Sequence, residues 1–194
     1  LGLGDIGPVA GMPVMEGKAM LFKRLAGING YPILIDEDDP EVVVTAVRAI
    51  APTFGAIKLE DIRAPECFVI EERLDAELDI PVLHDDQHGT AVVVLAALLN
   101  VGRETGVDLH RATLGIIGLG AAGSGIQRLL NAYGVSQIVG VDISEEMVRR
   151  FEGLGGRATD LEGVMGSADV VLATTGVPGL IEPAMVRAGQ VILA

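Results

Sequence analysis

The stretch Leu114-Gly115-Ile116-Ile117-Gly118-Leu119-Gly120-Ala121-Ala122-Gly123 decides the fold. Its apolar beginning predicts a buried strand, and its glycines follow the G-x-G-x-x-G spacing that joins such a strand to a helix. In this pattern the first glycine permits a tight turn, the second lets the backbone approach a pyrophosphate, and the third allows close packing of helix on strand. The stretch therefore predicts a turn that binds a dinucleotide at the start of a helix.

An acidic residue farther along the chain strengthens this interpretation. The next predicted strand, residues 136–141, ends at Asp142, about 20 residues beyond Gly123. A carboxylate there accepts hydrogen bonds from the adenosine ribose, whereas glycines that merely form a tight turn need no such partner. We assign the cofactor site to Gly118, Gly120, Ala121, Ala122, Gly123 and Asp142, together with Thr175 and Gly176.

Asp142 also bears on the choice of nicotinamide cofactor. Its carboxylate repels the 2′-phosphate that distinguishes NADP from NAD. The next basic residues, Arg149 and Arg150, lie a full helical turn or more away. We therefore expect NAD, and leave NADP open as the alternative.

Strands and helices alternate through the second half of the chain. Predicted strands cover residues 113–118, 136–141 and 169–173, predicted helices cover 122–133 and 145–153, and residues 190–194 indicate another buried strand. Helices between strands imply a parallel sheet that is covered on both faces. The predicted fold class is α/β, with a doubly wound parallel sheet of the Rossmann type.

The first half shows the same alternation less clearly. Glycines and prolines favour an irregular loop at residues 1–16. Helices are expected at 16–25, 40–50 and 90–101, the last strongly apolar and buried; strands are expected at 31–35, 55–59 and 80–83, with mixed structure at 66–75. We predict part of a smaller α/β domain at residues 1–88 and part of a Rossmann-type domain at 89–194, with the boundary near Gly89.

The composition excludes some partners. The 194 residues include 27 Asp and Glu against 14 Lys and Arg, and the net charge of -13 argues against nucleic acids and anionic membranes. The single Cys67 cannot form an internal disulfide, and no apolar run reaches the roughly 18 residues that span a bilayer. We expect a cytoplasmic protein. Because the chain starts at Leu1 and stops inside a predicted strand, we expect a fragment that lacks both ends.

Two acidic pairs follow predicted strands: Glu60-Asp61 and Asp85-Asp86. The carboxyl ends of parallel strands face the crevice in which α/β proteins bind ligands. Carboxylate oxygens there suit Mg²⁺ or Mn²⁺, although isolated acidic pairs are more often solvated surface groups. The apolar helix that follows Asp86 favours a buried seam and hence the metal site.

Four other residues have weaker signals. His84 and His88 have the i, i+4 spacing of zinc ligands on a helix, but they straddle a strand end, so local hydrogen bonding is the better interpretation. Cys67 has no visible partner base and is expected in the core. Lys18, at the start of an apolar helix, would by itself be interpreted as a surface charge.

Four blocks of sequence resemble the malic enzyme family in its short prokaryotic form. They are Leu3-Gly4-Asp5-Ile6-Gly7-Pro8, Pro13-Val14-Met15-Glu16-Gly17-Lys18, Leu59-Glu60-Asp61-Ile62 and Ile80-Pro81-Val82-Leu83-His84-Asp85-Asp86-Gln87-His88-Gly89-Thr90. They occur in the family's order, and the nucleotide motif follows where the family carries it. The resemblance covers essentially the whole chain.

The resemblance implies an activity and its residues. It implies oxidation and decarboxylation of malate to pyruvate with NAD(P) and Mg²⁺ or Mn²⁺, in a homo-oligomer that is a dimer or larger. By this resemblance Lys18 is the general base, Asp85 is a catalytic residue close to Lys18, and Glu60, Asp61 and Asp86 bind the metal. The metal would chelate the substrate, and hydride would pass from C2 of malate to the nicotinamide.

The chain departs from the family pattern in three ways. The proton-donating Tyr of the family lies upstream of Leu1, and neither Tyr31 nor Tyr133 occupies a matching motif. The family's Asn-containing block follows the strand at which this chain stops, and the segment after Asp142 is shorter than in many relatives. Two alternatives stay open: a malolactic enzyme, which releases lactate, and a non-catalytic nucleotide-sensing domain.

Overall fold

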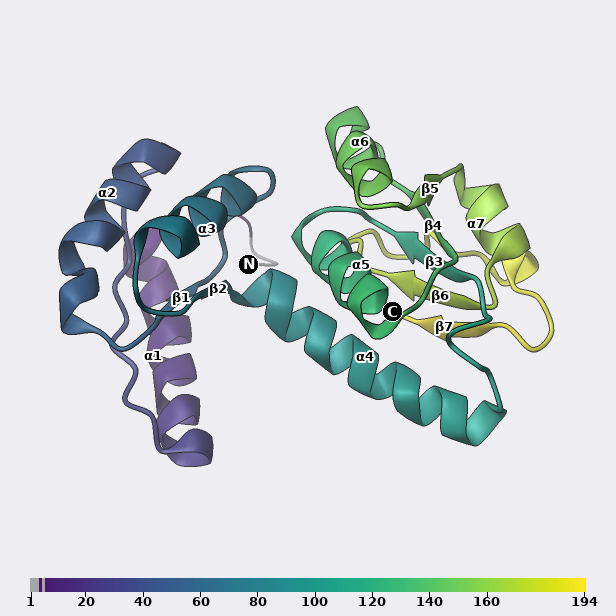
Figure 1. Ribbon diagram of the computed structural model, residues 1–194, viewed down its shortest axis with the longest axis horizontal. Helices are drawn as coiled ribbons and strands as arrows, with labels where there is room; N and C mark the ends of the chain where they lie inside the picture. Colours follow the sequence, from purple (N-terminus) through teal and green to yellow (C-terminus); the bar gives the residue numbers. More distant parts are fainter. Residues whose placement is uncertain (1–3, 5) are drawn as a thin grey trace.

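The computed structural model describes residues 4 and 6–194 and places two groups of elements on either side of one long helix (Figure 1). The first group contains α1 (Gly7–Ala26), α2 (Pro40–Ile50), η1 (Ala51–Thr53), β1 (Ile57–Leu59), α3 (Glu66–Glu77) and β2 (Val82–His84). Its two strands form a parallel pair in which Leu59 is opposite His84. The carboxyl ends of β1 and β2 therefore lie side by side, and the acidic pairs follow them.

The second group forms around a five-stranded parallel sheet. Its elements are β3 (Leu114–Ile117), α5 (Ala121–Tyr133), β4 (Ile138–Val141), α6 (Glu145–Gly153), β5 (Arg157–Ala158), α7 (Leu161–Ser167), β6 (Val170–Ala173), η2 (Pro183–Met185) and β7 (Val191–Leu193). The strand order is β5-β4-β3-β6-β7. The predicted α/β class with a Rossmann-type parallel sheet is confirmed.

Side chains on opposite faces of the sheet belong to two separate cores. Leu114 and Ile116 of β3 pack with Ile126 of α5, in the core that also includes residues of α4 and α6. Ile117 packs on the other face, with Val164 of α7. Successive side chains of a strand point to opposite faces, so the continuous apolar run of β3 follows from burial on both sides.

The strand order creates a crevice between β3 and β6. From β3 the chain first moves outward through β4 to β5, and it then returns to the other side of β3 for β6 and β7. Ligands of open α/β sheets bind at the carboxyl ends of strands where the order reverses in this way. The glycine motif follows β3, and Thr175 and Gly176 follow β6, so the topology brings these predicted cofactor residues to the same crevice.

The long helix α4 (Asp85–Thr105) joins the two groups. It begins directly after β2 and packs along α5. The two helices come close at Gly125 of α5, where a Cβ atom would lie 2.3 Å from the Gln87 carbonyl oxygen. The predicted domain boundary at Gly89 lies within this continuous helix. The division into residues 1–88 and 89–194 therefore stays a prediction.

The prediction that residues 90–101 form a buried helix is only partly correct. Ala91 and Leu98 are buried against the second group. In contrast, Val92 and Val93 are 60% and 69% exposed. An apolar helix is buried only where another element covers it, and among the described residues α5 covers one side of α4.

Local capping sets the ends of several helices. The side chain of Asp39 accepts a hydrogen bond from the Glu41 N–H at 2.9 Å, and Pro40 occupies the first turn of α2, where a missing N–H costs little. Asp160 caps α7 in the same way through the Gly163 N–H at 2.7 Å. The cap at Asp39 explains why the predicted start of the helix at residues 40–50 agrees with the structure, whereas α7 was not predicted.

The predicted irregular loop at residues 1–16 is wrong from Gly7 onward, because α1 begins there rather than at Glu16. Pro8 lies in the first turn, where proline is well tolerated, and Pro13 lies inside the helix. The density of glycine and proline therefore predicted an irregular loop where residues from Gly7 onward form a helix. Residues 1–3 and 5 of the predicted loop lie outside the described residues.

The strand predicted at residues 31–35 is also wrong. This segment contains no strand, and Tyr31 and Ile33 are 70% and 52% exposed. Only Ile35 packs against a core, that of α2, α3 and the β1–β2 pair. An apolar run forms a strand only where a neighbouring backbone completes its hydrogen bonds. Residues 66–75, predicted as mixed structure, lie within the regular helix α3.

A charged contact ties the two groups together. Glu72 of α3 accepts hydrogen bonds from Arg128 of α5 at 3.1 Å and from Arg150 of α6 at 3.0 Å. The bond from Arg150 is the main cause that lowers the pKa of the Glu72 carboxyl group. The Arg150 guanidinium also stacks 3.8 Å from the centre of the Phe68 ring. α3 is thus attached to the nucleotide half of the chain.

No helix within residues 4 and 6–194 is long and apolar enough to cross a membrane.

Candidate active site

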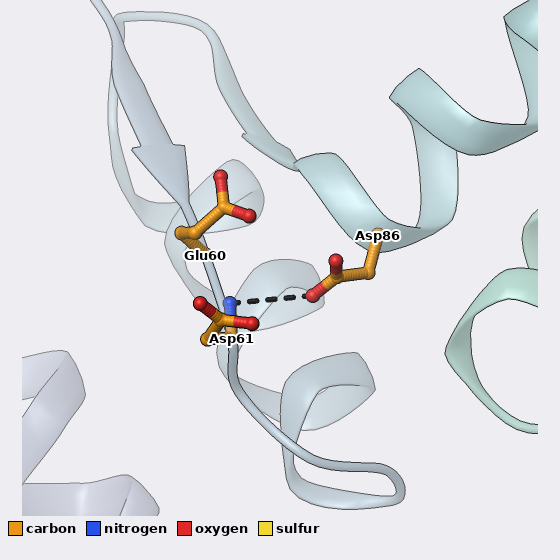
Figure 2. Close-up of side chains that lie close together, drawn as sticks. All are labelled: Glu60, Asp61 and Asp86. Carbon is orange, nitrogen blue, oxygen red and sulfur yellow. Dashed lines mark hydrogen bonds between the residues drawn. The ribbon is translucent and has the colours of Figure 1, made fainter. Parts of the chain in front are cut away.

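The carboxylates that follow β1 and β2 converge on one point (Figure 2). Oxygen atoms of Glu60, Asp61 and Asp86 all lie within 4.8 Å of one another. The Asp61 N–H donates a hydrogen bond to Asp86 Oδ2 at 3.2 Å, which joins the end of β1 to the first turn of α4. The structure therefore brings together the three residues to which the resemblance assigned metal binding.

This cluster fits a divalent cation. Its ligand atoms are carboxylate oxygens, which Mg²⁺ and Mn²⁺ prefer over nitrogen or sulfur. Two oxygens on opposite sides of a Mg²⁺ ion lie about 4.2 Å apart, so small side-chain adjustments would suffice. Carboxylates this close repel one another, and a cation between them would remove that cost.

Two lysines reach into the same cluster. Lys18 of α1 contacts Glu60 Oε1, and its Nζ atom lies 4.0 Å from Asp85 Oδ2. Lys58 of β1 contacts Glu60 Oε2, and its Nζ atom lies 3.0 Å from the same Asp85 oxygen. The expected proximity of Lys18 and Asp85 is found. Lys58 was not among the predicted site residues.

A buried carboxylate holds the start of α4. Glu71 of α3 is 6% exposed. Its Oε1 atom accepts a hydrogen bond from the backbone N–H of His84 at 2.6 Å and lies 2.8 Å from His88 Nε2. Its Oε2 atom accepts a hydrogen bond from the Gln87 side chain at 2.9 Å. Glu71 thereby fixes the residues on either side of Asp85-Asp86.

The two histidines do not form a zinc pair. His84 ends β2 and His88 lies in α4, so they do not share one helical face. The predicted local hydrogen bonding holds for the ring of His88, but His84 makes its bond through the backbone. The His84 ring is fully buried, neither ring nitrogen has a hydrogen-bond partner among the described residues, and Nε2 lies 3.6 Å from Asp86 Oδ2. Burial lowers the pKa of this imidazole, which keeps it neutral.

Cys67 is a core residue, as the sequence predicted. Its side chain is fully buried in α3. Burial, with smaller contributions from the negative charges of Glu71 and Asp86, raises the pKa of its thiol to about 12. The thiol therefore stays protonated and takes no part in nucleophilic chemistry.

The glycine motif adopts the geometry that a dinucleotide loop requires. Gly118 has a φ of +93°, which a residue with a side chain rarely adopts. A Cβ atom on Gly123 would lie 2.0 Å from the Gly118 carbonyl oxygen, so only glycine allows α5 to approach β3. Ala121 and Ala122 form the first turn of α5, and Gly120 caps it. The first N–H groups of a helix have no partner within it, so this helix end can bind the phosphates of a dinucleotide.

Neighbouring strands support the loop from both sides. Asp142, at the end of β4, accepts hydrogen bonds from the Leu119 N–H at 2.6 Å and the Ser144 N–H at 2.8 Å. Thr174, after β6, donates a hydrogen bond to the Gly118 carbonyl at 2.8 Å. The methyl group of Thr175 lies beside Gly118. Each carboxylate oxygen of Asp142 retains a lone pair for a further hydrogen bond.

Comparisons with known proteins agree with this geometry. A family model described as "Malic enzyme, N-terminal domain" matches residues 1–42, and one described as "D-isomer specific 2-hydroxyacid dehydrogenase, NAD binding domain" matches residues 92–178. The NAD-dependent malic enzyme 1 of Bacillus subtilis is 60% identical over 195 residues, which cover 100% of this chain and 44% of that protein. The chain belongs to the malic enzyme family.

Two further relatives place the chain within the malic enzymes. The bifunctional malic/malolactic enzyme of Bacillus subtilis is 51% identical over 142 residues, or 73% of this chain and 35% of that protein. The crystal structure of malic enzyme from Pyrococcus horikoshii Ot3 superposes with a TM-score of 0.85 at 43% identity, over 95% of this chain and 48% of that one. The chain thus spans about half the length of the malic enzymes it matches, or less.

Within this malic enzyme chain, sequence reasoning missed two residues of the site. Glu71 lies in a helix with many acidic residues, and no spacing distinguishes it from Glu72. Lys58 lies two residues before Glu60, so its side chain could have been placed on the same face of the strand as Glu60. That alternation was the signal that could have found it.

Proposed function

We propose that the full-length protein oxidises and decarboxylates L-malate to pyruvate and CO₂, with reduction of NAD or NADP. The observation that carries this proposal is the meeting of Lys18 and Asp85 with the carboxylates of Glu60, Asp61 and Asp86. The dinucleotide loop in the second half of the same chain supports it, as does the 60% identity to the NAD-dependent malic enzyme 1 of Bacillus subtilis.

In this proposal Glu60, Asp61 and Asp86 hold Mg²⁺ or Mn²⁺. When bound, the cation would polarise the C2 oxygen of the substrate and offset the negative charge of its carboxylates. The three residues come from the ends of β1 and the start of α4, so the paired strands preorganise them. Hydrogen bonding by Glu71 keeps α4 in place.

Lys18 accepts the proton of the C2 hydroxyl group in the proposed reaction. It is 33% exposed and extends from α1 to the carboxylates at the ends of both strands. In the structure its ion pair with Glu60 places its amino group at the site. A lysine suits this role better than an arginine, because arginine cannot release its proton near neutral pH.

The proposed cofactor is NAD, bound at Gly118, Gly120, Ala121, Ala122, Gly123, Asp142, Thr175 and Gly176. When bound, its nicotinamide would accept the hydride from C2. The carboxylate of Asp142 supports NAD over NADP, because it would repel a 2′-phosphate. The proposed reaction can use either NAD or NADP, so the preference for NAD can be tested directly.

Other features of the whole protein are proposals as well. We expect a cytoplasmic homo-oligomer, a dimer or larger, that acts on malate and pyruvate and binds neither nucleic acid nor membrane. The net charge of -13 supports the absence of those two partners. We also retain a substrate and metal domain at residues 1–88 and a nucleotide domain at 89–194, joined through α4.

A malolactic activity is the second candidate. The observation in its favour is the 51% identity to a relative whose name includes both malic and malolactic activity. The same residues would act on malate, but the product released would be lactate. The two activities therefore differ in product and not in the site described.

Product analysis with full-length protein tests the proposal. The protein would be incubated with L-malate, NAD or NADP, and Mg²⁺ or Mn²⁺, while NAD(P)H, pyruvate, lactate and CO₂ are quantified. Equal amounts of reduced cofactor, pyruvate and CO₂ are the expected result. Lactate without net cofactor reduction would favour the malolactic candidate, and no turnover of malate would reject both.

A further inference from the structure

Lys58 lies inside the site without an assigned role. It comes from the short strand β1, and its side chain is 23% exposed. Its ammonium group contacts Glu60 and lies 3.0 Å from Asp85 Oδ2. It also lies 5.7 Å from the centre of the Phe22 ring on α1. These contacts hold it among charged groups of the site and not in solvent.

Lys18 and Lys58 share the same two carboxylates. Each contacts a different oxygen of Glu60, and both approach the same oxygen of Asp85. The distances to that oxygen differ, since Lys58 is at 3.0 Å and Lys18 is at 4.0 Å. Lys58 is therefore within hydrogen-bond range of Asp85, and Lys18 is beyond it.

Metal binding would separate the roles of the two lysines. Glu60 is one of the proposed metal ligands, so its charge would turn toward the cation and away from both ammonium groups. Asp85 then remains as the acceptor that the lysines share. Because Lys58 already holds Asp85, Lys18 is the lysine without a close carboxylate and is free to face a substrate hydroxyl.

Charge supports the need for both lysines. The site contains the four carboxylates of Glu60, Asp61, Asp85 and Asp86, against the two ammonium groups. A divalent cation offsets two of the four negative charges, and Lys58 offsets a third while Lys18 is the neutral amine that accepts the proton. Without Lys58, Lys18 would be the one cation that the described residues place beside Asp85, and the attraction would draw it there.

We propose that Lys58 is a positioning residue that pairs with Asp85 and so leaves Lys18 free to accept the proton from malate. The inference rests on the proposed function and adds a residue to it. Lys58 itself need not touch the substrate, and it acts through Asp85.

Lys58→Met removes the charge and keeps a similar length. In full-length protein with Mn²⁺ and NAD, we expect kcat for malate to fall by about 10–100-fold, the usual effect of removing a residue that orients a catalytic group. KM should change far less, and Lys58→Arg, which retains a cation, should recover most of the lost kcat. Lys23→Met is the matched control, because Lys23 lies on the exposed surface of α1 and bonds Asn29.

A double-mutant cycle tests whether Lys58 acts through Asp85. In the Asp85→Asn background, Lys58→Met should reduce kcat much less than in the wild type, because Lys18 is no longer drawn to a carboxylate. Mn²⁺ affinity, measured by electron paramagnetic resonance, should not fall in Lys58→Met, since the change removes a positive charge beside Glu60.

The outcomes separate this proposal from the proposed function. A wild-type protein without malate activity would overturn both. If the wild type is active, three results would each overturn the role of Lys58 alone. They are an unchanged kcat in Lys58→Met, equal losses of kcat in the wild-type and Asp85→Asn backgrounds, and weakened Mn²⁺ binding that parallels the loss of kcat.

Discussion

The carboxylate of Glu71 accepts a hydrogen bond from the backbone N–H of His84 at 2.6 Å, at the last residue of β2 and directly before α4. The same buried side chain also contacts Gln87 and His88 in the first turn of α4. Asp85 and Asp86 lie between these positions. Glu71 therefore fixes the direction of two side chains in the proposed chemistry without touching the substrate.

Replacing Glu71 by Gln should weaken the connection between the end of β2 and the first turn of α4. The amide would turn a donor toward N–H groups that need an acceptor, and we expect a loss of about 1–3 kcal/mol in the free energy of unfolding. Mn²⁺ affinity should fall by about 10–100-fold, because the first turn of α4 carries Asp86. Denaturant unfolding and a Mn²⁺ titration measure the two effects.

The control for this change is Asp75→Asn, an exposed position on the same helix. It removes one charge of α3 and should leave both the free energy of unfolding and the Mn²⁺ affinity unaltered. A folded Glu71→Gln protein with normal Mn²⁺ affinity would show that Glu71 is not needed to position the first turn of α4.

The metal cluster makes its own prediction. Asp86→Ala or Glu60→Ala should abolish malate oxidation at ordinary metal concentrations, because each removes one of three carboxylates that lie within 4.8 Å of one another. NAD binding should stay nearly intact, since the glycine loop lies in the other group of elements. Glu104→Ala, at the exposed far end of α4, is the matched control. Near-normal turnover of Asp86→Ala in the presence of a chelator would mean that these carboxylates are surface acids.

Cys67 should be inert in the folded protein. With a pKa raised to about 12, roughly one thiol in ten thousand is ionised at pH 8, and the side chain is also fully buried. We expect iodoacetamide at pH 8 to leave the native protein unlabelled and to modify one thiol per chain in denaturant, as mass spectrometry would show. Rapid labelling of native protein would contradict the buried placement of this part of α3.

Most of the second half of the chain was predictable because local signals and tertiary contacts agree there, although β5 and α7 were not predicted. The β3 run is apolar because both faces of the sheet are covered, and Gly123 is required by the 2.0 Å approach to Gly118. The helix predicted at residues 145–153 coincides with α6, where Ser144 caps the first turn. Each of these features produces a recognisable pattern within a few residues of sequence.

The first half was less predictable because its structure depends on distant partners. Residues 31–35 are apolar, but no neighbouring strand among the described residues pairs with them. Glu71 acts on residues that follow it by more than a dozen positions, and Lys18 meets Glu60 across 42 positions. Periodicity within a short window cannot reveal such contacts, so Lys18 was found through resemblance and Glu71 was missed.

Asp142 predicts the cofactor preference. Full-length enzyme should have a higher kcat/KM with NAD than with NADP, because the carboxylate at the end of β4 would face the 2′-phosphate. Asp142→Asn removes the charge and should reduce the ratio of kcat/KM with NAD to kcat/KM with NADP. Steady-state kinetics with both cofactors would measure this ratio. A tenfold preference of the wild type for NADP, about 1.4 kcal/mol, would contradict this and point to a basic residue such as Arg149 near the ribose.

Lys18 offers the most direct test of the whole account, because its role joins α1 to the carboxylate cluster and to the proposed chemistry. If Lys18 accepts the hydroxyl proton, Lys18→Ala should lower kcat for malate by roughly 10²–10⁴-fold, with a much smaller change in KM. Lys18→Arg should be almost as damaging, since guanidinium keeps the charge but cannot release its proton near neutral pH. The decisive measurement is therefore kcat of Lys18→Arg relative to Lys18→Ala in full-length protein with Mn²⁺. Similar large losses in both are the predicted result, whereas recovery of activity in Lys18→Arg would make Lys18 an electrostatic anchor and contradict its role as the base.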